Sequence, residues 1–512
     1  QFDKTTIEDL GLIKLDLLSL RTLSAVEDTM ESIHRSGHDV NYRQIPLDDP
    51  ATYRRLNSGQ TVGIFQLESP AQRALQARLG ADNIEDIVAS VALIRPGPIQ
   101  GNMVEPFLAR RHGLEPITYS HPKLERILQK TYGVVLFQEQ VIEIATAIAG
   151  FTPGESDRLR KVMTHFRSQK EMNDIGQEFI AKAIANGVDR DTAETIFSYI
   201  VGYAGYGFCE AHAAAFSDTA YKTSYLIEHY PAHFFAALLN HQPMGFYPPN
   251  TLCLEARNRG VAILPLDINR SEIDFTATDN TIRVGLKAVS GLGRQTQEAI
   301  IAARTDGGDF THLRDFCLRV PLEKDELERL ILGGAFDRLH PNRKQLLWQM
   351  DSVWKDIKCK QQYSFCDIDE SFAKSLNGEY EIPDFSEVEK FLAEYKVLGF
   401  HHSRHPMEFC RSQLRKQHIL TSKEVAAAAP GSTVTTAGVV IRPHRPPTRS
   451  GRTVAFLTLE DEFDLIDVTV FENVYHRYGR IIFTQPALII TGKVEQRGNA
   501  KSITAQKVAP LV

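Results

Sequence analysis

Cysteine is scarce in this sequence, and no two cysteines form a CxxC pair. The six cysteines are scattered over 512 residues. This spacing does not indicate a disulfide framework, and it argues against a zinc site built on closely spaced cysteines. We therefore expect a protein of a reducing compartment, for which the cytoplasm fits best.

Long apolar runs, low-complexity tracts and a targeting signal are missing as well. No segment approaches the roughly 20 consecutive apolar residues of a transmembrane helix, so no membrane partner is expected. The opening residues, QFDKTTIEDLGL, have neither the basic start nor the apolar core of a signal peptide. They begin without Met and in the middle of a pattern, from which we expect a fragment or a processed chain.

An excess of positive charge is also lacking. The sequence has 58 Lys and Arg against 64 Asp and Glu, which gives a net charge of −6. This balance argues against a surface that coats nucleic acid throughout, although local basic patches decide DNA binding and the total does not. A chain of 512 residues, 43% of them hydrophobic, is long enough for three or four domains.

The first 60 residues predict a strand followed by helices. Lys14 and Asp16 alternate with apolar residues in GLIKLDLLSL, which indicates a strand whose polar face carries both side chains. A helix is expected over about 19–36 and should end at Gly37. The carboxylate of Asp16 could hold Mg²⁺ while Lys14 neutralises phosphate charge. Taken alone, the pair is better interpreted as an ordinary exposed Lys/Asp pair.

The remaining chain changes character along its length. Residues 61–250 are predicted to be mostly helical, and 250–350 to form a short α/β element followed by small helices. Residues 351–432 are interpreted as a linker region. Beyond 432 the sequence turns to short segments rich in Val, Ile and Thr, with a helical stretch, ENVYHRYG, between the third and the fourth. These segments are VTTAGVVI, TVAFLTLE, DLIDVTVF, PALIITGKV and AKSITAQKV.

This organisation predicts a multidomain α+β protein. Most of it should be helical, with helix–hairpin–helix regions, and five strands with one intervening helix predict a C-terminal OB-fold barrel. OB folds commonly bind single-stranded nucleic acid.

Basic residues on the helical segments are candidates for binding phosphate. Arg95 precedes a rigid Pro-Gly-Pro turn, and Arg158, Arg160 and Lys161 follow a Gly-Glu-Ser helix start. Polyphosphate binding needs several fixed cations, and arginine supplies bidentate contacts. The alternative is a solvated basic face.

A histidine follows the glycine- and aromatic-rich segment at 202–208. His212 opens an alanine-rich helix, where small side chains let another surface approach. It could hydrogen-bond a phosphate or a base, or it could be a capping residue, and the residues alone slightly favour the cap.

The segment VGLKAVSGLGRQTQEAIIAAR (284–304) fits a helix–hairpin–helix motif. The turn contains Gly291 and Gly293, an amphipathic helix follows it, and Lys287 and Arg294 flank it. In this motif backbone N–H groups face a DNA phosphate.

The loop between the first two barrel strands is basic and contains no acid. It reads RPHRPPTRSGR, with Arg442, Arg445, Arg449 and Arg452 around His444. This loop borders the nucleic-acid face of OB folds, which makes the arginines candidate DNA contacts. A solvated turn is the alternative.

Together these segments resemble the bacterial family C DNA polymerases, the DNA polymerase III alpha subunits. The resemblance covers essentially the whole chain. The matching stretches, in order, are GLIKLDLLSLRTL, GIFQLESPAQR, IRPGPI, HPKLERILQKTYGVVLFQEQV, AGFTPGESDRLRKVM, GYGFCEAHAAAF and YPAHFFAALLN.

The resemblance implies a role for each candidate residue. Asp16 matches the third catalytic, metal-binding aspartate of the palm, and Lys14 matches the lysine beside it. The finger residues lining the channel for the incoming nucleotide and template would be Arg95, Arg158, Arg160, Lys161 and His212. The reaction implied is nucleotidyl transfer from a dNTP to a primer 3′-hydroxyl on a DNA template, with Mg²⁺ as cofactor.

The resemblance also divides the chain into domains. It implies the end of the palm at 1–60, fingers at 61–250, a tandem helix–hairpin–helix region that binds duplex or clamp at 251–350, a linker at 351–432 and an OB domain at 433–512. The family's first two palm aspartates and its phosphoesterase-like domain precede the first residue here. We therefore expect these 512 residues to be inactive alone.

Two departures favour one branch of the family. Replicative members have Asn-Lys-Ser where this sequence has Cys209-Glu210-Ala211, and residues 242–247 read QPMGFY. Both features resemble the error-prone, damage-inducible branch and imply translesion synthesis. The alternatives are a replicative alpha subunit and a non-catalytic DNA-binding module of helix–hairpin–helix and OB domains. Residues 361–365 (QQYSF) are a candidate sliding-clamp peptide with a poor match to the expected pattern.

Overall fold

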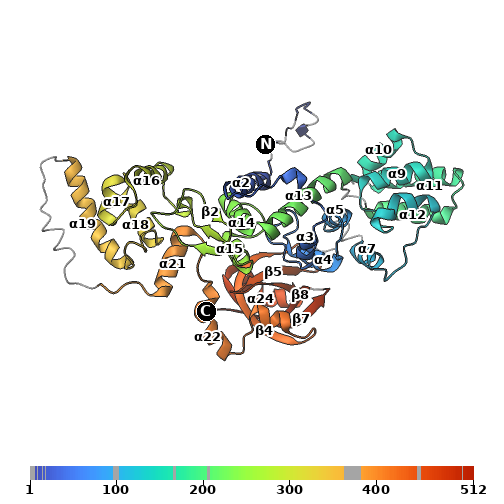
Figure 1. Cartoon of the computed structure of the whole chain (residues 1–512). Helices are drawn as coiled ribbons and strands as arrows, with labels where there is room; N and C mark the ends of the chain where they lie inside the picture. The colour runs from blue at the N-terminus through green and yellow to red at the C-terminus, as the bar shows by residue number, and fades with distance from the viewer. Residues whose placement is uncertain are drawn as a thin grey trace.

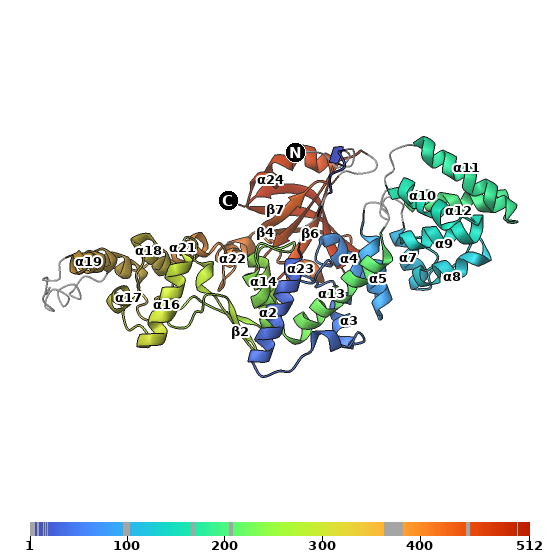
Figure 2. The ribbon, with the colours of Figure 1, turned by 90° about the horizontal axis from the view of Figure 1, so that it is seen from above.

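The computed structural model describes residues 6–7, 10–13, 15, 17, 19–95, 103–164, 169–203, 208–362, 382–446, 451–498 and 500–511. Figures 1 and 2 show an elongated molecule: a central helical body carries a helical lobe at each end and a barrel on one side. Lys14, Asp16 and Arg449 lie outside the described residues, as does most of the candidate clamp peptide.

The central body is built from helices that are distant in sequence. Side chains at the N-caps of three of them, Asp49, Ser69 and Asn83, accept backbone N–H groups of the first turn. The helices are α2 (Arg21–Arg35), α3 (Pro50–Asn57), α4 (Pro70–Leu79), α5 (Ile84–Leu93), α13 (Glu210–His229), α14 (Pro231–Asn240) and α15 (Pro249–Asn258). The helix expected over about 19–36 is confirmed as α2.

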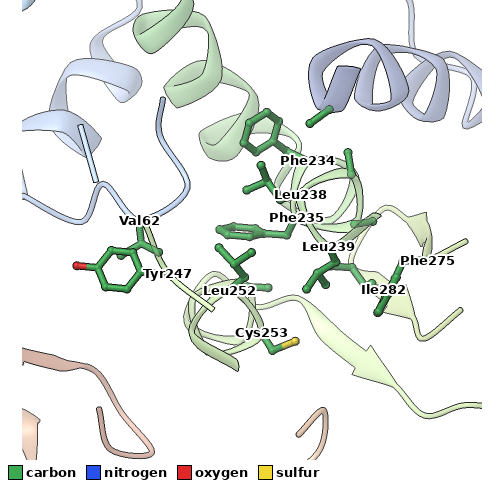
Figure 3. Packing of buried hydrophobic residues seen from close by; sticks show 14 of the residues in the cluster. Val62, Phe234, Phe235, Leu238, Leu239, Tyr247, Leu252, Cys253, Phe275 and Ile282 are labelled. Carbon is green, nitrogen blue, oxygen red and sulfur yellow. The ribbon is translucent and has the colours of Figure 1, made fainter. Parts of the chain in front are cut away.

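Helix α14 forms the centre of the main core. Its sequence, PAHFFAALLN, is apolar on nearly all sides, and such a helix must be buried. Pro231 starts it, at the position where a missing N–H has no cost. Figure 3 shows Phe234, Phe235, Leu238 and Leu239 packed among side chains of neighbouring elements. Each such side chain contributes about 1.5–3 kcal/mol on burial, so α14 anchors the body.

One lobe contains the helices between α5 and α13 and has a core of its own. Phe151, Phe179 and Ile196 are fully buried in that core. The helices are α7 (Val104–Arg111), α8 (Glu125–Leu128), α9 (Gln138–Ala149), α10 (Pro153–Thr164), α11 (Gln169–Ala185) and α12 (Arg190–Tyr203). The helical character predicted for 61–250 is confirmed. That range is split, however, because α3–α5 and α13–α14 pack together in the central body.

The opposite lobe begins with a small mixed sheet. Strand β3 (Thr281–Arg283) pairs in parallel with β1 (Ala262–Leu264) and antiparallel with β2 (Thr276–Thr278). Four helices follow, α16 (Arg294–Gly307), α17 (Leu313–Arg319), α18 (Lys324–Leu332) and α19 (Arg343–Gln362). The predicted α/β element followed by small helices is confirmed.

The interpretation of 351–432 as a linker is wrong for its described part. Residues up to 362 continue α19, and beyond 381 the chain forms α21 (Glu387–Leu398), α22 (Pro406–Lys416) and α23 (Ser422–Ala427). Each of the last three helices starts with a capping box, in which a glutamate three residues into the helix accepts the N-cap backbone N–H. Because the helix starts are polar, these segments resemble a linker in the sequence. Their apolar residues, such as Phe400, are nevertheless buried in the main core.

The C-terminal barrel closes in the order β4-β5-β6-β8-β7. Among the described strands of the barrel, β6 and β8 pair in parallel and the other pairs are antiparallel. A buried row including Leu457, Val468 and Ile490 fills the interior. The elements are β4 (Thr433–His444), β5 (Val454–Glu460), β6 (Leu465–Phe471), α24 (Glu472–Thr484), β7 (Ala487–Arg497) and β8 (Ala500–Pro510). The predicted five strands, with a helix between the third and fourth, are confirmed, and with them the fold class.

Among the described residues, no helix combines the length and the apolar character that crossing a lipid bilayer requires.

Candidate nucleic-acid interface

A pocket opens where the central body meets the barrel. It has a volume of about 380 Å³, and residues from five separated segments line it. Two of the sequence-predicted cations, Arg95 at the end of α5 and Arg442 on β4, are among them. The other lining residues are Thr22, Phe65, Gln66, Glu68, Ser69, Gln72, Val91, Ile94, Gly245 and Phe246.

A row of aromatic rings links Arg95 to His212. The Arg95 guanidinium lies 3.5 Å from the centre of the Phe208 ring, and that ring is 5.2 Å from the exposed imidazole of His212. His212 in turn stacks 3.9 Å from Phe216, which contacts Phe65 in the pocket wall at 5.1 Å. The structure thus brings Arg95 and His212 together on ring faces that suit a nucleobase beside a phosphate.

His212 does not cap its helix. The first turn of α13 is capped by Glu139 of α9, whose carboxylate accepts the backbone N–H of Glu210 at 2.9 Å. The same carboxylate accepts the Cys209 thiol at 3.2 Å. Glu210, the acid that replaces a lysine of replicative relatives, makes a 2.5 Å ion pair with Lys130. The structure therefore does not support the interpretation of His212 as a capping residue.

Glu68 is a half-buried acid among the pocket cations. Burial raises the pKa of its carboxyl to about 7, although hydrogen bonds from the backbone of Phe246 and Gly63 and the charge of Arg442 act in the opposite direction. The carboxyl therefore changes its charge near neutral pH. Sequence reasoning missed Glu68, because part of its environment comes from Phe246 and Arg442, which are more than 170 positions away.

Arg442 faces the body of the protein. Its guanidinium donates to the carbonyl oxygen of Phe246 at 2.8 Å and lies 4.7 Å from the centre of that ring. Its backbone has a φ of 46°, in the left-handed region that non-glycine residues seldom adopt. Arg442 therefore joins the barrel to the segment 242–247, and its predicted contact with DNA stays a prediction.

The segment 242–247 also receives hydrogen bonds from two helices of the body. Arg21 of α2 donates to the carbonyl oxygen of Pro243 at 2.9 Å. Arg73 of α4 donates to the hydroxyl of Tyr247 at 3.2 Å and approaches Asp467 of the barrel at 3.7 Å. The sequence QPMGFY resembles the error-prone branch of the polymerases. Its residues Gly245 and Phe246 line the pocket, at the junction of body and barrel.

Three other basic residues of the barrel loop, His444, Arg445 and Arg452, are exposed. Arg445 donates to the hydroxyl of Tyr475 on α24 at 3.3 Å, and His444 stacks 5.7 Å from Phe456. Arg452 is exposed at the far end of the loop. Arg445 and Arg452 thus border a barrel face that also carries aromatic rings, which is the composition of a single-strand binding surface.

The cations of α10 lie in the separate lobe and do not line the pocket. Arg160 and Lys161 pair with Asp157 at 2.8 and 3.0 Å, and Arg158 is 3.4 Å from Glu178. Lys161 and then Arg160 lower the pKa of Asp157. A phosphate must compete with these acids for the three cations.

The predicted hairpin is formed, but its amide does not face open solvent. Gly291 has a φ of 80° and Leu292 is buried, as the turn requires. The N–H of Gly293, at the start of α16, donates to the Glu326 carboxylate of α18 at 2.8 Å, and the Thr296 hydroxyl donates to it at 2.9 Å. In this structure a carboxylate of the chain takes the place expected for a phosphate, and the predicted contact of this N–H with DNA stays a prediction.

The flanking cations of the hairpin are paired in the same way. Lys287 contacts Asp274 at 2.7 Å, and Arg294 contacts Glu298 at 2.7 Å. Burial would raise the pKa of Glu326, but hydrogen bonds from Glu323, Gly293 and Thr296 outweigh it and lower the pKa. A charged carboxylate at the hairpin was not predicted, because Glu326 is 33 positions from Gly293.

Comparison with known proteins matches each of these regions. Residues 22–187 match the finger domain of the bacterial DNA polymerase III alpha subunit. Residues 260–346 match a helix-hairpin-helix motif, and 434–511 match an OB-fold nucleic acid binding domain.

Several relatives that match essentially the whole chain are named error-prone DNA polymerases. The chain is 54% identical to the error-prone DNA polymerase of Symbiobacterium thermophilum, over all of this chain and 50% of the relative. It is 37% identical to that of Anaeromyxobacter dehalogenans (100% and 46% covered) and 36% identical to that of Alkalilimnicola ehrlichii (99% and 49%). The chain is thus similar over its whole length to error-prone DNA polymerases and, at residues 22–187, to the finger domain of the DNA polymerase III alpha subunit. It spans about half the length of the curated relatives it matches.

The pocket lies between parts of the chain that match two of these domains. Arg95 and Glu68 fall within the finger match. Arg442 falls within the match to the OB-fold nucleic acid binding domain. His212 lies outside both matches, and it reaches the pocket through Phe216, whose ring contacts Phe65 in the pocket wall.

Proposed function

We propose that this chain is the finger, helix–hairpin–helix and OB part of an error-prone DNA polymerase that carries out translesion synthesis. The observation that carries the proposal is the pocket lined by Arg95 and Arg442 beside the QPMGFY segment, with His212 linked to Arg95 through the ring of Phe208. The similarity to relatives named error-prone DNA polymerases supports it.

In the proposed reaction the primer 3′-hydroxyl attacks the α-phosphorus of the incoming dNTP. The new P–O bond forms as the bond to pyrophosphate breaks, and the proton of the hydroxyl leaves with a base. Two Mg²⁺ ions, one of them bound by Asp16, would stabilise the attacking and leaving oxygens. Lys14 would neutralise phosphate charge, Arg95 would contact the triphosphate, and His212 would stack on or donate to the nucleotide.

The remaining regions are proposed to hold DNA. The helix–hairpin–helix lobe would contact the backbone of the duplex without reading its sequence, and the barrel loop would contact single-stranded template. The domain roles proposed are palm end (1–60), fingers (61–250), duplex binding (251–350) and OB (433–512). Residues 361–365 are proposed as a candidate contact with a sliding clamp. We also propose that the polymerase works in the cytoplasm, because the chromosomal DNA that it would copy lies there.

Kinetics of the full polymerase that contains this chain test the pocket. Arg95→Ala should raise KM for dNTP at least about tenfold, because a charge-assisted contact to phosphate is worth about 1.5–3 kcal/mol. The control is Arg158→Ala, a finger cation that pairs with Glu178 outside the pocket. Equal effects of the two variants would count against a nucleotide site at the pocket.

Primer extension by the 512 residues alone tests the proposal that this chain carries only one of the catalytic carboxylates. Asp16 is the one catalytic carboxylate that the resemblance assigns to this chain, and two-metal chemistry needs more. We expect no extension with Mg²⁺ and all four dNTPs, and any templated product would overturn the assignment.

Two other functions have specific support. A replicative alpha subunit shares the whole family architecture, and a deletion strain whose damage-induced mutation frequency is unchanged would favour it. A non-catalytic DNA-binding module would explain the helix–hairpin–helix and OB matches alone. Loss of dNTP incorporation on Arg95→Ala, with unchanged DNA binding, would exclude that module.

A further inference from the structure

Two histidines and a glutamate meet in the interior, away from the pocket and the hairpin. His401 follows α21, His405 is the N-cap of α22, and Glu460 is the last residue of β5. Their exposed fractions are 5%, 1% and 1%. One ligand atom from each lies within 4.8 Å of the others. The cluster therefore spans the boundary between the helical segment and the barrel, which adjoin in Figure 1.

His401 is the unusual member of the cluster. Neither of its ring nitrogens has a hydrogen-bond partner among the described residues. A buried polar group without a partner is rare in native structures, and such a group calls for an unseen ligand.

The other two members are held in place by neighbours. The Thr251 hydroxyl of α15 donates to one carboxylate oxygen of Glu460, and Nε2 of His405 lies 3.3 Å from the other. A hydrogen bond that orients a ligating carboxylate is the usual outer support of a metal site. The charge of Glu460 is needed there, because a cation bound by two neutral imidazoles alone would be buried without compensation.

We propose that His401, His405 and Glu460 bind a divalent transition metal, with Zn²⁺ as the best match. Zinc takes imidazole nitrogen and carboxylate oxygen at about 2.0–2.2 Å in tetrahedral geometry, which needs ligands about 3.4 Å apart. The three groups therefore move together slightly when the ion binds, and water takes the fourth position. Mg²⁺ and Ca²⁺ prefer all-oxygen sites and fit poorly.

The bound ion changes one contact in the cluster. Nδ1 of His405 accepts the backbone N–H of Met407 at 3.2 Å. With the metal on Nε2, the ring proton moves to Nδ1 and this weak capping bond is lost. The loss of this one bond is small compared with the metal–ligand bonds that form. The ion would link strand β5 to the start of α22 and so fix the barrel on the body.

Metal content and stability of the 512-residue chain test the proposal. After equilibration with ZnCl₂ and gel filtration, we expect one zinc per chain for the wild type and none for His401→Phe. Cobalt should give the visible absorption of a tetrahedral site in the wild type and not in the variant. The matched control is His402→Gln, the adjacent histidine, equally buried, whose ring faces Glu394 at 3.2 Å.

The stability of His401→Phe, measured with and without zinc, shows whether His401 is a metal ligand or an ordinary buried histidine. In EDTA, His401→Phe should be at least as stable as the wild type, because it removes an unpartnered polar ring. In zinc the order should reverse. Thr251→Val should weaken zinc binding about 10–100-fold. Zinc below one tenth per wild-type chain, equal metal loss in His402→Gln, or a stability order unaffected by zinc would each overturn the site.

Discussion

The side chain of Arg442 stabilises the junction of body and barrel. Its guanidinium contacts both the carbonyl oxygen and the ring of Phe246. We predict that Arg442→Ala lowers the free energy of unfolding by about 1–2 kcal/mol, the sum of one hydrogen bond and one cation–π contact. Urea unfolding measures the loss, and amide hydrogen exchange should accelerate in residues 242–247.

The control for this prediction is Arg445→Ala in the same loop. Arg445 is exposed and contacts Tyr475 within the barrel, so its loss should leave exchange at 242–247 unchanged. If both variants accelerate exchange there equally, the junction is not held by Arg442.

Glu68 gives the junction a dependence on pH. Its pKa is about 7 in the folded state against a usual 4.5, so the folded protein retains the proton more strongly. The stabilisation is complete below about pH 4.5 and is lost as the pH rises through about 7. Glu68→Gln, which stays neutral, should therefore remove part of the loss of stability between about pH 4.5 and 7.

Urea unfolding at several pH values checks the Glu68 prediction. Glu85→Gln is the control, since Glu85 is an exposed acid on α5. Asp464, whose pKa is raised to about 6 by burial and Glu255, should act mainly at lower pH. An unchanged pH profile in Glu68→Gln would contradict the assignment.

At the scale of elements, local patterns were sufficient for most of the fold. The barrel strands were predicted because Val, Ile and Thr alternate with polar residues in them, and α2 because its apolar residues recur with helical spacing. The helices after residue 381 were missed because their starts are polar, as in the box of Ser386 with Glu389. Their burial depends on contacts such as that of Phe275 with Phe400, which no local pattern encodes.

For the helix–hairpin–helix, the sequence predicted the turn. It did not predict that a carboxylate of the chain accepts the backbone N–H at which a phosphate was expected. The turn at Gly291 follows from local sequence, but occupation of the Gly293 N–H by Glu326 depends on the packing of α18 on α16. We predict that Glu326→Gln raises the affinity for duplex DNA about two- to fivefold. This is the 0.3–1 kcal/mol that a charge contributes at a helix N-terminus.

Fluorescence anisotropy of a labelled duplex measures the change in affinity. Glu328→Gln removes the same charge from an exposed position of α18, and it should raise affinity less. Equal gains would mean that only net charge matters and that the hairpin does not approach the phosphates.

At the scale of the molecule, the candidate site depends on contacts between regions distant in sequence. The sequence predicted Arg95, His212 and Arg442 separately, and the fold brings the first two together through Phe208 and places the third in the same pocket wall. The cations of α10 were grouped with them by sequence and lie in another lobe. Only tertiary packing separates these cases, because each cation has the same local signature.

The net charge of −6 means that DNA binding depends on a few local cations in this chain. Each phosphate contact to a single strand contributes about 0.7 to the slope of log K against log salt. If Arg445 and Arg452 each contact a phosphate, replacing both with Ala should lower that slope for single-stranded DNA by about 1.4. The matched pair Arg158→Ala and Arg160→Ala should change it less, because both residues already contact carboxylates. Anisotropy titrations at several salt concentrations decide between the surfaces, and equal slopes for the two double variants would remove the barrel loop as the single-strand contact.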